Sequence, residues 1–282
     1  MVTIPATAVQ TGADTLVAGL ECFNLDLTLG CGQAFRWQKT GVGAWHGVAF
    51  GLALDISQSG EGLLLKNTAE AQYESVWKRY FGLDTDYAAL CARLGRDGGL
   101  RQAVEASPGI RILRQEPWET LCSFILSQNN NIPRVTGIVR RLCECFGEPL
   151  GHGDFAFPAA ERLAALEPEA LEPLRAGYRA SYLLDAARKA ASGELDLREL
   201  ESLSTCEARV RLTAVRGVGR KVADCTLLYG FGRLEVVPVD VWMRRVLREM
   251  YPAGLPACAG DCGGVAQQYL FHWRRSAGHP RP

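Results

Sequence analysis

Lys221 and Asp240 have the residue types and the sequence surroundings of a pair that attacks a sugar carbon. Lys221 falls in the first turn of a predicted helix over 220–229, where the positive end of the helix dipole works against an ammonium and favours the nucleophilic amine. Asp240 follows the apolar run at 236–239 and begins the next helical pattern, over 241–251. An amine nucleophile with a carboxylate suits attack at C1′ of a sugar through an oxocarbenium-like state.

The segment before this lysine is a glycine turn between two helical patterns. Gly217 and Gly219 separate the pattern over 206–214 from the one that begins at Arg220. Glycine permits positive φ and lets another backbone come close. The N–H groups of Val218, Gly219 and Arg220 would then point outward at a helix N-terminus, which is a site for an anion. The turn therefore predicts a phosphate-binding hairpin.

Each of these residues also has a structural interpretation, and taken singly that interpretation is the better one. Lys221 would be a solvated helix lysine, and Asp240 a plain N-cap. Their occurrence together after a glycine hairpin favours a functional role.

The string G-V-G-R-K-V-A-D-C, followed by V-P-V-D, resembles the helix-hairpin-helix DNA glycosylase superfamily. The resemblance implies that the hairpin grips DNA phosphate, that Lys221 is the Schiff-base nucleophile and that Asp240 is catalytic. The family's usual Leu-Pro-Gly-Val-Gly is the segment 215–219 here, with Arg216 in place of proline, which weakens the pre-set turn. Two positions after the aspartate the family often has a phosphate-contacting histidine, whereas this chain has Trp242, whose indole N–H is the donor that remains.

Two further strings, G-Q-A-F-R-W at 32–37 and A-Q-x-x-L-F near the C-terminus, resemble 8-oxoguanine DNA glycosylases. The resemblance implies that the carbonyl of Gly32 accepts the N7 hydrogen of the damaged base and that Gln267 binds its Watson–Crick edge. Phe271 would stack on one ring face and Cys225 would cover the other. From the residues alone, Gly32 is a turn glycine, Phe271 a core residue and Gln267 part of a solvated face.

The string L-S-Q-N-N-N-I-P-R, with G-Y-R-A further on, carries the same resemblance. Three consecutive asparagines interrupt a helix because their side chains compete for backbone groups, and Asn131 can cap the next helix. Amides and guanidinium groups are also what recognise base edges. The resemblance implies that Asn129 and Arg134 bind the cytosine left without its partner. Arg179 would be a second cytosine contact, and Tyr178 the wedge beside the extruded base, although a half-buried helix aromatic explains Tyr178 equally well.

The elements that must position these residues form an α+β fold. Alternating hydrophobicity between glycine turns predicts an antiparallel sheet, followed by helices from residue 70 onward. We expect an N-terminal sheet domain with helices over 1–107, then a helical DNA-binding and catalytic region over 108–282. The tail over 274–282 is basic and expected to fray. The predicted strands are 23–29, 34–38, 44–50, 52–57 and 62–66, and the predicted helices are 71–81, 86–94, 99–106, 118–127, 175–191, 206–214, 220–229, 241–251 and 264–276.

Composition limits the partners and cofactors. Among 282 residues, Lys+Arg 31 balance Asp+Glu 31, so nucleic acid must be bound by a local patch or by backbone amides. The first twenty residues lack a secretory signal, and no segment is long and apolar enough to span a membrane, so we expect an intracellular monomer. The 10 cysteines show no repeated spacing, and the late pair Cys258 and Cys262 is too small a set for a four-cysteine iron–sulfur cluster.

The resemblance as a whole implies a base-excision-repair enzyme that flips 8-oxoguanine, paired with cytosine, out of duplex DNA and also cleaves abasic sites by β-elimination. No cofactor is required, and a cation on the backbone carbonyls of Thr213, Val215 and Val218 is a further implication. Two alternatives stay open. A glycosylase for oxidised pyrimidines or alkylated bases is disfavoured by the missing cluster cysteines and the asparagines at 129–131. A non-enzymatic DNA-binding module is disfavoured by the lysine and aspartate, which phosphate binding does not need.

Overall fold

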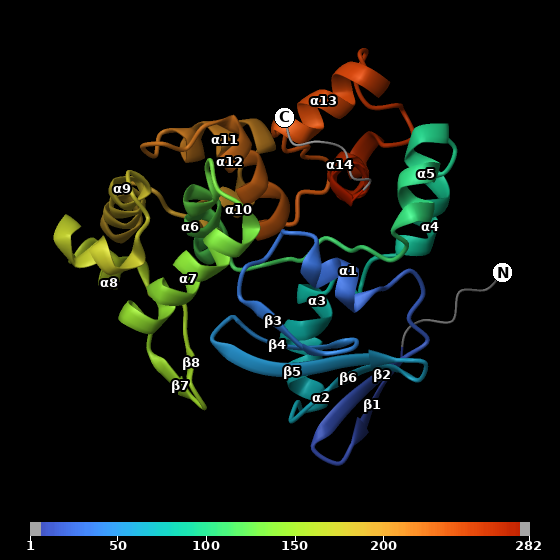
Figure 1. The fold of residues 1–282 in the computed structure, drawn as a ribbon, viewed down its shortest axis with the longest axis horizontal. Coiled ribbons are helices and arrows are strands. Elements are labelled where there is room, and N and C mark those ends of the chain that lie inside the picture. The colour runs from blue at the N-terminus through green and yellow to red at the C-terminus, as the bar shows by residue number, and fades with distance from the viewer. Residues whose placement is uncertain (1–6, 277–282) are drawn as a thin grey trace.

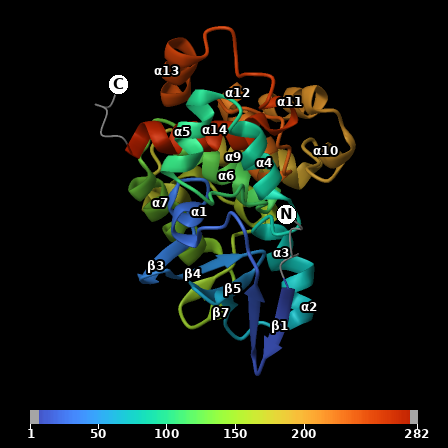
Figure 2. The same ribbon diagram turned by 90° about the vertical axis from the view of Figure 1, so that its right-hand side faces the viewer.

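The structure is a computed structural model that describes residues 7–276 of the chain. It confirms the α+β class, because a six-stranded antiparallel sheet with a few helices is followed by a mostly helical part (Figure 1). The sheet lies at one end of the molecule and the helices above it, an arrangement that is also clear in the turned view (Figure 2). Within the described range, no helix is both long and apolar enough to cross a membrane. Of the tail expected to fray, 274–276 belong to the last helix and 277–282 lie outside the described residues.

The sheet is a four-stranded meander with a hairpin added at one edge. Strands β3 to β6 pair in chain order, and three of them lie where the alternating pattern predicted strands, whereas β3 begins at Trp37 and not at Ala34. The hairpin of β1 and β2 was not predicted, and β2 pairs antiparallel with β6. The strand order is β1-β2-β6-β5-β4-β3. The strands are β1 (Thr7–Thr11), β2 (Asp14–Ala18), β3 (Trp37–Gly41), β4 (Ala44–Ala49), β5 (Leu52–Ser59) and β6 (Gly62–Leu65).

The prediction of a strand over 23–29 is wrong, because this segment forms helix α1 (Leu25–Gly30). The side-chain oxygen of Asn24 accepts a hydrogen bond from the N–H of Leu27 at 2.9 Å and caps the helix. The first and fifth residues of the helix, Leu25 and Leu29, are both buried. A spacing of four places two side chains on one face of a strand and also on one face of a helix, so the sequence pattern alone was ambiguous.

The helices predicted with bounds lie close to where hydrophobic periodicity predicted them, whereas those at 132–146, 160–164 and 199–202 were not predicted with bounds. The helix expected from Arg175 begins later, because Arg175 and Gly177 both have left-handed backbone conformations, with φ of 54° and 61°. Two helices pass into a π-helical turn, at 73–77 and 226–230. The helical segments are α2 (Glu70–Gln72), η1 (Tyr73–Trp77), α3 (Lys78–Tyr80), α4 (Tyr87–Leu94), α5 (Gly98–Ala106), α6 (Pro117–Ser127), α7 (Ile132–Phe146), α8 (Ala160–Ala164), η2 (Pro168–Leu174), α9 (Arg179–Ser192), α10 (Glu199–Ser202), α11 (Thr205–Thr213), α12 (Arg220–Cys225), η3 (Thr226–Gly230), α13 (Val241–Met250), η4 (Gly260–Cys262) and α14 (Gly263–Ser276).

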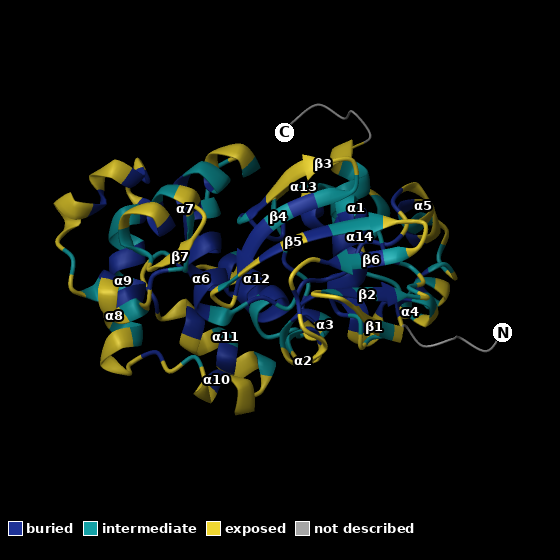
Figure 3. Ribbon diagram, turned by 90° about the horizontal axis from the view of Figure 1, so that it is seen from below, coloured by how far each residue is buried: buried dark blue, intermediate teal, exposed yellow. Residues whose placement is uncertain are grey.

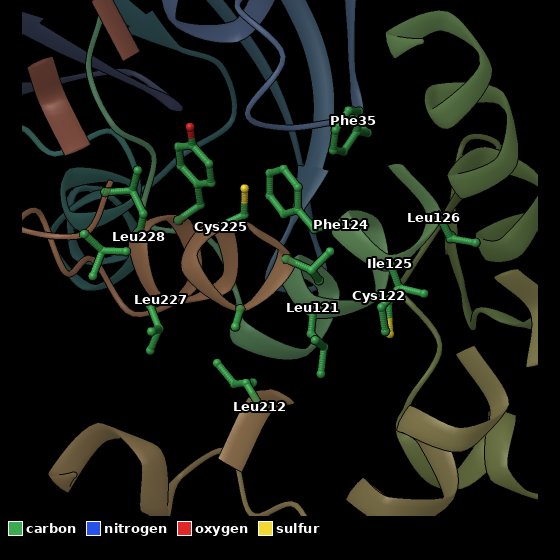
Figure 4. Packing of buried hydrophobic residues seen from close by; sticks show 14 of the residues in the cluster. Phe35, Leu121, Cys122, Phe124, Ile125, Leu126, Leu212, Cys225, Leu227 and Leu228 are labelled. Carbon is green, nitrogen blue, oxygen red and sulfur yellow. The ribbon is translucent and has the colours of Figure 1, made fainter. Parts of the chain in front are cut away.

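Helix α6 is the central element of the helical part. Every residue from Trp118 to Leu126 is buried, so the helix is enclosed on all sides (Figure 3). It packs against α7, α9, α12 and η3. Its buried side chains Leu121, Phe124 and Ile125 pack with residues of α12 and η3 (Figure 4). A helix that is apolar all round is expected in the middle of a core.

Two buried arginines tie the sheet to the helices. Arg36, just before β3, pairs with Glu119 of α6 at 3.0 Å and also donates to the carbonyl of Phe155. Arg111 donates to four backbone carbonyls that precede α1 and α4. The hydrophobic core forms two clusters, one under the sheet and one among the helices, and these arginines lie where the clusters adjoin. The division into domains after residue 107 stays a prediction.

A histidine joins the sheet to a small hairpin of the helical part, β7 (Pro149–Gly151) and β8 (Asp154–Phe155). The Nδ1 of His46 lies 2.9 Å from Asp55 of β5, and its Nε2 lies 3.0 Å from Asp154 of β8. Partial burial lowers the pKa of His46, but hydrogen bonds and charge attraction from Asp154 and Asp55 outweigh it, so the pKa is raised. The protonated imidazole therefore bridges two carboxylates on separate elements.

We predict that His46→Gln lowers the free energy of unfolding by about 1 kcal/mol or less near pH 6, the scale of partly exposed ion pairs. Because the pKa is raised in the folded state, this contribution is complete below the unfolded pKa of about 6.5 and is lost as the pH rises through the folded pKa. Urea unfolding at pH 6 and pH 9 measures the difference. His152→Gln, in the exposed turn of the same hairpin, is the control. An equal loss at both pH values would contradict a charged bridge.

Candidate active site

Lys221 lies against an aromatic wall in the middle of the helical part. It occupies the first turn of α12, and its Nζ is 4.9 Å from the ring centroid of Phe124. The ring of Phe124 stacks on Tyr229, with centroids 5.3 Å apart and an interplanar angle of 14°, and meets Phe35 edge-on at 5.8 Å. Phe35, Phe124 and Cys225 are adjacent in Figure 4. A cation over a ring face is attracted by the ring quadrupole, so the ring of Phe124 helps to hold the amine in place.

Cys225 and Asp240 complete the surroundings of this amine. Cys225 follows Lys221 by one helical turn, and burial raises the pKa of its thiol to about 11. The charge of Lys221 and its hydrogen bond to the sulfur oppose that shift, whereas the charge of Asp240 adds to it. Asp240 is the N-cap of α13, where its Oδ1 accepts from the N–H of Met243 at 2.8 Å. The capping role foreseen for Asp240 is present, and it leaves the second carboxylate oxygen for other partners.

Gly32 lies in a loop that a buried glutamine holds in place. Its φ is +91°, and within residues 7–276 no protein donor hydrogen-bonds to its carbonyl. The amide of the next residue, Gln33, donates to the carbonyls of Thr28 and Arg111 at 2.9 and 2.7 Å. Its oxygen accepts from the N–H of Leu113 at 2.9 Å. The saturated glutamine fixes the loop and leaves the glycine carbonyl available as an acceptor.

Helix α14 places Gln267 and Phe271 one turn apart. Gln267 is 4% exposed, and its Oε1 has no hydrogen-bond partner. Its neighbour Gln268 is also buried and accepts from the hydroxyl of Tyr229 at 2.6 Å, which connects α14 to the aromatic wall. Phe271 is half-buried, with the guanidinium of Arg275 5.8 Å from its ring centroid. A buried polar atom without a partner is rare in native proteins and indicates a ligand or water that fills the position. The solvated face foreseen for Gln267 is therefore wrong.

Each of the three asparagines between α6 and α7 has a backbone role. Asn129 adopts a left-handed conformation with φ of 48°, and its amide donates to the hydroxyl of Tyr178 at 3.1 Å. Asn130 donates to the carbonyl of Leu126 at the end of α6. Asn131 caps α7, as predicted, because its side-chain oxygen accepts from the N–H of Arg134 at 2.9 Å. We refer to 128–131 as the asparagine turn.

The two arginines predicted beside the asparagine turn have different surroundings. Arg134 is exposed on the first turn of α7. Arg179 is 5% exposed, and its guanidinium donates to the carbonyls of Gln128, Asn129 and Ala176. Arg179 thus stabilises the asparagine turn. To contact a ligand, its guanidinium would first have to release one of these backbone carbonyls.

The glycine hairpin opens onto the asparagine turn. Gly217 has φ of +78°, and an added Cβ would lie 2.1 Å from the ring of Tyr182. Gly219 is the N-cap of α12 with an extended backbone, and nothing lies within 4 Å of an added Cβ. Between hairpin and turn is an open hollow of about 790 Å³. It is lined by Gln128, Asn129, Tyr178, Tyr182 and residues 213–219.

The structure therefore brings many of the predicted residues into two places. Asn129, Tyr178 and the hairpin share the hollow, while Lys221 and Cys225 meet at the aromatic wall beside Asp240. Arg134 and Trp242 belong to neither, and Trp242 lies half-buried in the first turn of α13.

Four residues that matter here were not singled out from the sequence. They are Gln33, Phe124, Tyr182 and Tyr229. Phe124 lay within a helix recognised only as strongly apolar, and the other three adjoin recognised motifs. Their partners are distant along the chain, so no local spacing could have identified them.

Comparison with known proteins gives consistent matches to both parts of the chain. Residues 15–121 match the family described as 8-oxoguanine DNA glycosylase, N-terminal domain, and residues 122–254 match the HhH-GPD superfamily base excision DNA repair protein family. The N-glycosylase/DNA lyase of Saccharomyces cerevisiae is 38% identical over 188 residues, which are 61% of this chain and 50% of the yeast protein, so the match spans half of that relative.

Two further relatives match over most of the chain. The N-glycosylase/DNA lyase OGG1 of Arabidopsis thaliana is 30% identical over 287 residues, covering 90% of this chain and 74% of the plant protein. Among solved structures, the Clostridium acetobutylicum 8-oxoguanine glycosylase/lyase, in complex with duplex DNA containing cytosine opposite 8-oxoguanine, superposes with a TM-score of 0.92. It is 33% identical, and the match covers 98% of this chain and 100% of that one.

We predict that Gly217→Ala lowers the free energy of unfolding by about 2 kcal/mol, because a left-handed alanine costs about 1–2 kcal/mol and its methyl would overlap the Tyr182 ring. Gly219→Ala should cost less than about 1 kcal/mol, because its position is extended and open. Urea unfolding of the two variants beside the parent compares them directly. Equal stability of the two would show that the hairpin does not need a left-handed residue at 217.

Proposed function

Because this chain belongs to the 8-oxoguanine DNA glycosylase family of helix-hairpin-helix base excision repair proteins, we propose that it excises 8-oxoguanine from duplex DNA and then cleaves the strand at the abasic site. The observation that carries the proposal is the position of Lys221. This amine lies on an aromatic wall, beside Cys225 and Asp240, one turn after a hairpin suited to phosphate.

The hairpin holds the DNA by its backbone. Gly219 and Arg220, at the start of α12, are exposed, and their N–H groups carry the positive end of the helix dipole, which suits a phosphate without a long side chain. The N–H of Val218, expected to point outward with them, instead donates to the carbonyl of Val215 at 3.0 Å. The neutral overall charge of the protein makes this local grip important. Extruding one nucleotide costs a few kcal/mol of stacking and pairing, which contacts in the pocket must offset.

In this proposal the extruded base is held between Cys225 and Phe271. A flat purine fits between a thiol and an aromatic ring, and the unpartnered Oε1 of Gln267 is a buried acceptor for a donor on the base edge. The carbonyl of Gly32 accepts the N7–H that 8-oxoguanine has and guanine lacks. Guanine presents a lone pair there, so the same carbonyl discriminates against the normal base.

The chemistry begins when the Nζ of Lys221 attacks C1′ of the damaged nucleotide. The bond from C1′ to the base nitrogen breaks, and its electron pair leaves with the base. The carboxylate of Asp240 stabilises the positive charge that develops on the sugar. Opening of the sugar ring gives an imine between Nζ and C1′. Loss of a C2′ proton then expels the 3′ phosphate oxygen by β-elimination and nicks the strand.

The cytosine left in the helix is bound from the asparagine turn. Arg134 is exposed beside the turn, and its guanidinium donors match the acceptors of cytosine. Asn129 presents its side chain next to Tyr178, which is 49% exposed and fits the wedge that fills the vacated stack. Arg179 contributes by holding the turn, and becomes a second cytosine contact when it exchanges a carbonyl partner for the base.

A cation on the hairpin is compatible with the residues present. Thr213, Val215 and Val218 all line the hollow beside the hairpin. The carbonyl of Val215 accepts from the N–H of Val218 at 3.0 Å, and its second lone pair can ligate a hard cation. Such an ion would stiffen the hairpin and add positive charge next to the phosphate. Among the described residues no cluster of three His, Cys, Asp or Glu side chains could hold a metal.

We predict that Lys221→Gln binds a duplex with 8-oxoguanine opposite cytosine but neither excises the base nor forms a covalent adduct with borohydride. The chain has five lysines, and the other four, Lys39, Lys66, Lys78 and Lys189, are remote from the aromatic wall or held in ion pairs. Lys78→Gln, which loses only its pair with Glu74, is the control and should still be trapped. Denaturing electrophoresis of borohydride-treated mixtures measures the adduct. Trapping of Lys221→Gln at the parent level would place the nucleophile elsewhere.

We predict that Gly32→Ala keeps its affinity for an abasic-site duplex but excises 8-oxoguanine about 5- to 150-fold more slowly, since one unsatisfied buried group costs about 1–3 kcal/mol. A φ of +91° is strained for alanine, and the new methyl would lie 2.4 Å from Cδ1 of Ile132, so we expect the loop that carries the carbonyl to shift. Gly30→Ala is the control, because its nearest neighbour is the Trp45 ring at 4.0 Å. Single-turnover excision is measured beside duplex affinity. Parent-like excision by Gly32→Ala would remove Gly32 from base recognition.

A further inference from the structure

The hairpin turn has a geometry in which proline is common, yet it contains arginine. The N–H of Val218 donates to the carbonyl of Val215 at 3.0 Å, which closes a four-residue turn. Gly217, the third residue, has φ of +78°, as a type II turn requires. Proline often fills the second position of such turns because its ring fixes φ. Arg216 stands there, so the turn must be held by other means.

A hydrogen bond from the N–H of Arg216 holds the turn in place of a proline ring. This N–H donates to Oδ2 of Asp185 at 2.8 Å, a hydrogen bond that proline could not make. Asp185 lies on α9, 31 residues earlier in the chain. The acceptor is a carboxylate, and hydrogen bonds to ionised acceptors are stronger than those between neutral groups. The turn is therefore fixed from outside by a neighbouring helix.

Asp185 belongs to a row of three residues on α9, Tyr182, Asp185 and Lys189, which we call the α9 stripe. Their spacing of three and four places them on one face of the helix. The Tyr182 ring lies against Gly217, and the guanidinium of Arg216 is 5.8 Å from its centroid. The Nζ of Lys189 donates to the carbonyl of Ala214 at 3.2 Å. The stripe thus contacts the hairpin at 214, 216 and 217.

The stripe also reaches the asparagine turn. Tyr178, one helical turn before Tyr182, meets the Tyr182 ring edge-on at 5.5 Å. The hydroxyl of Tyr178 accepts from the amide of Asn129 at 3.1 Å. One face of α9 therefore contacts both walls of the hollow, the hairpin and the turn.

We propose that Asp185 is a positioning residue that sets the hairpin in its phosphate-binding shape through the Arg216 N–H. The proposal rests on the proposed function, in which the hairpin grips DNA. A carboxylate beside a phosphate site repels DNA, so its electrostatic effect opposes binding while its hydrogen bond favours it. Without this hydrogen bond, we expect the turn to adopt other conformations as well, in which the N–H groups of α12 are no longer aligned.

Comparison of Asp185→Ala with Asp185→Asn separates the two effects. Both variants remove the same charge, but the asparagine oxygen can still accept from Arg216. We expect the alanine variant to bind a duplex with an abasic analogue about three- to tenfold more weakly than the asparagine variant, the range for one net hydrogen bond. Single-turnover excision at saturating protein should be the same for both, because Asp185 contacts no reacting atom. Equal affinities of the two variants would overturn the proposal.

Substitutions at position 216 test whether the effect of Asp185 depends on the Arg216 N–H. Arg216→Pro removes the N–H and fixes φ, so the difference between alanine and asparagine at 185 should vanish. Arg216→Ala removes the guanidinium but keeps the N–H, so the difference should persist. A difference that survives in the proline background, or disappears in the alanine background, would show that Asp185 acts by another route.

Hydrogen exchange of the Arg216 amide gives a readout that does not involve DNA. Exchange should be slow in the parent and in Asp185→Asn, and faster in Asp185→Ala. If the Arg216 amide of the parent exchanges slowly but the parent neither binds the duplex nor excises 8-oxoguanine, the proposed function fails while the contact between Asp185 and the hairpin stands. Normal excision by the parent, with equal exchange and affinity in both Asp185 variants, would overturn the positioning role alone.

Discussion

The complete burial of α6 constrains the rest of the helical part. Because all sides of the helix from Trp118 to Leu126 are enclosed, four neighbouring segments must pack on it at fixed positions. One of its side chains, Phe124, is the wall for Lys221, and its last turn leads directly into the asparagine turn. Near its start, Glu119 pairs with Arg36 and so orients the sheet. The surroundings of Lys221, the asparagine turn and the packing against the sheet therefore share one rigid element.

Some buried polar side chains in this protein have all their donors and acceptors paired, whereas others keep an atom without a partner. Gln33, Arg111 and Arg179 use their donors on backbone carbonyls, and each fixes a loop. Gln267 is equally buried, but its oxygen has no partner. An unpaired buried polar group costs about 1–3 kcal/mol, so the oxygen of Gln267 is a position that a ligand or water can complete. The free energy that this unpaired oxygen costs the protein alone can be recovered when a ligand pairs with it.

The features that could be predicted from the sequence are those that depend on residues close together in the chain. The glycine hairpin, the Asn131 cap and most helices follow from local rules, and the structure has them. The segment 23–29 fitted both a strand and a helix, and the tertiary contacts of Leu25 and Leu29 decided it. The strand β1 is exposed and polar, so it has no alternating pattern to detect.

The parts of the site that could not be predicted depend on distant contacts. The aromatic wall joins α6 to η3, about a hundred residues apart, and the Asp185 contact joins α9 to the hairpin. The sequence showed that proline is absent at position 216 and that the turn is weaker for it. It did not show that the carboxylate of Asp185 compensates for this loss. The site residues taken from resemblance keep the status of predictions until variants are measured.

The scarcity of lysine has a chemical consequence for an enzyme whose product carries an aldehyde. An opened abasic sugar forms imines with any accessible amine, and a stray adduct would trap the protein on its product. Around the hairpin and the asparagine turn, Arg134, Arg216 and Arg220 supply guanidinium groups and not amines. Lys189, which lies near the hairpin as Lys221 does, is held by Glu194 and a backbone carbonyl. The surface can therefore attract DNA without a second nucleophile competing with the one that is meant to react.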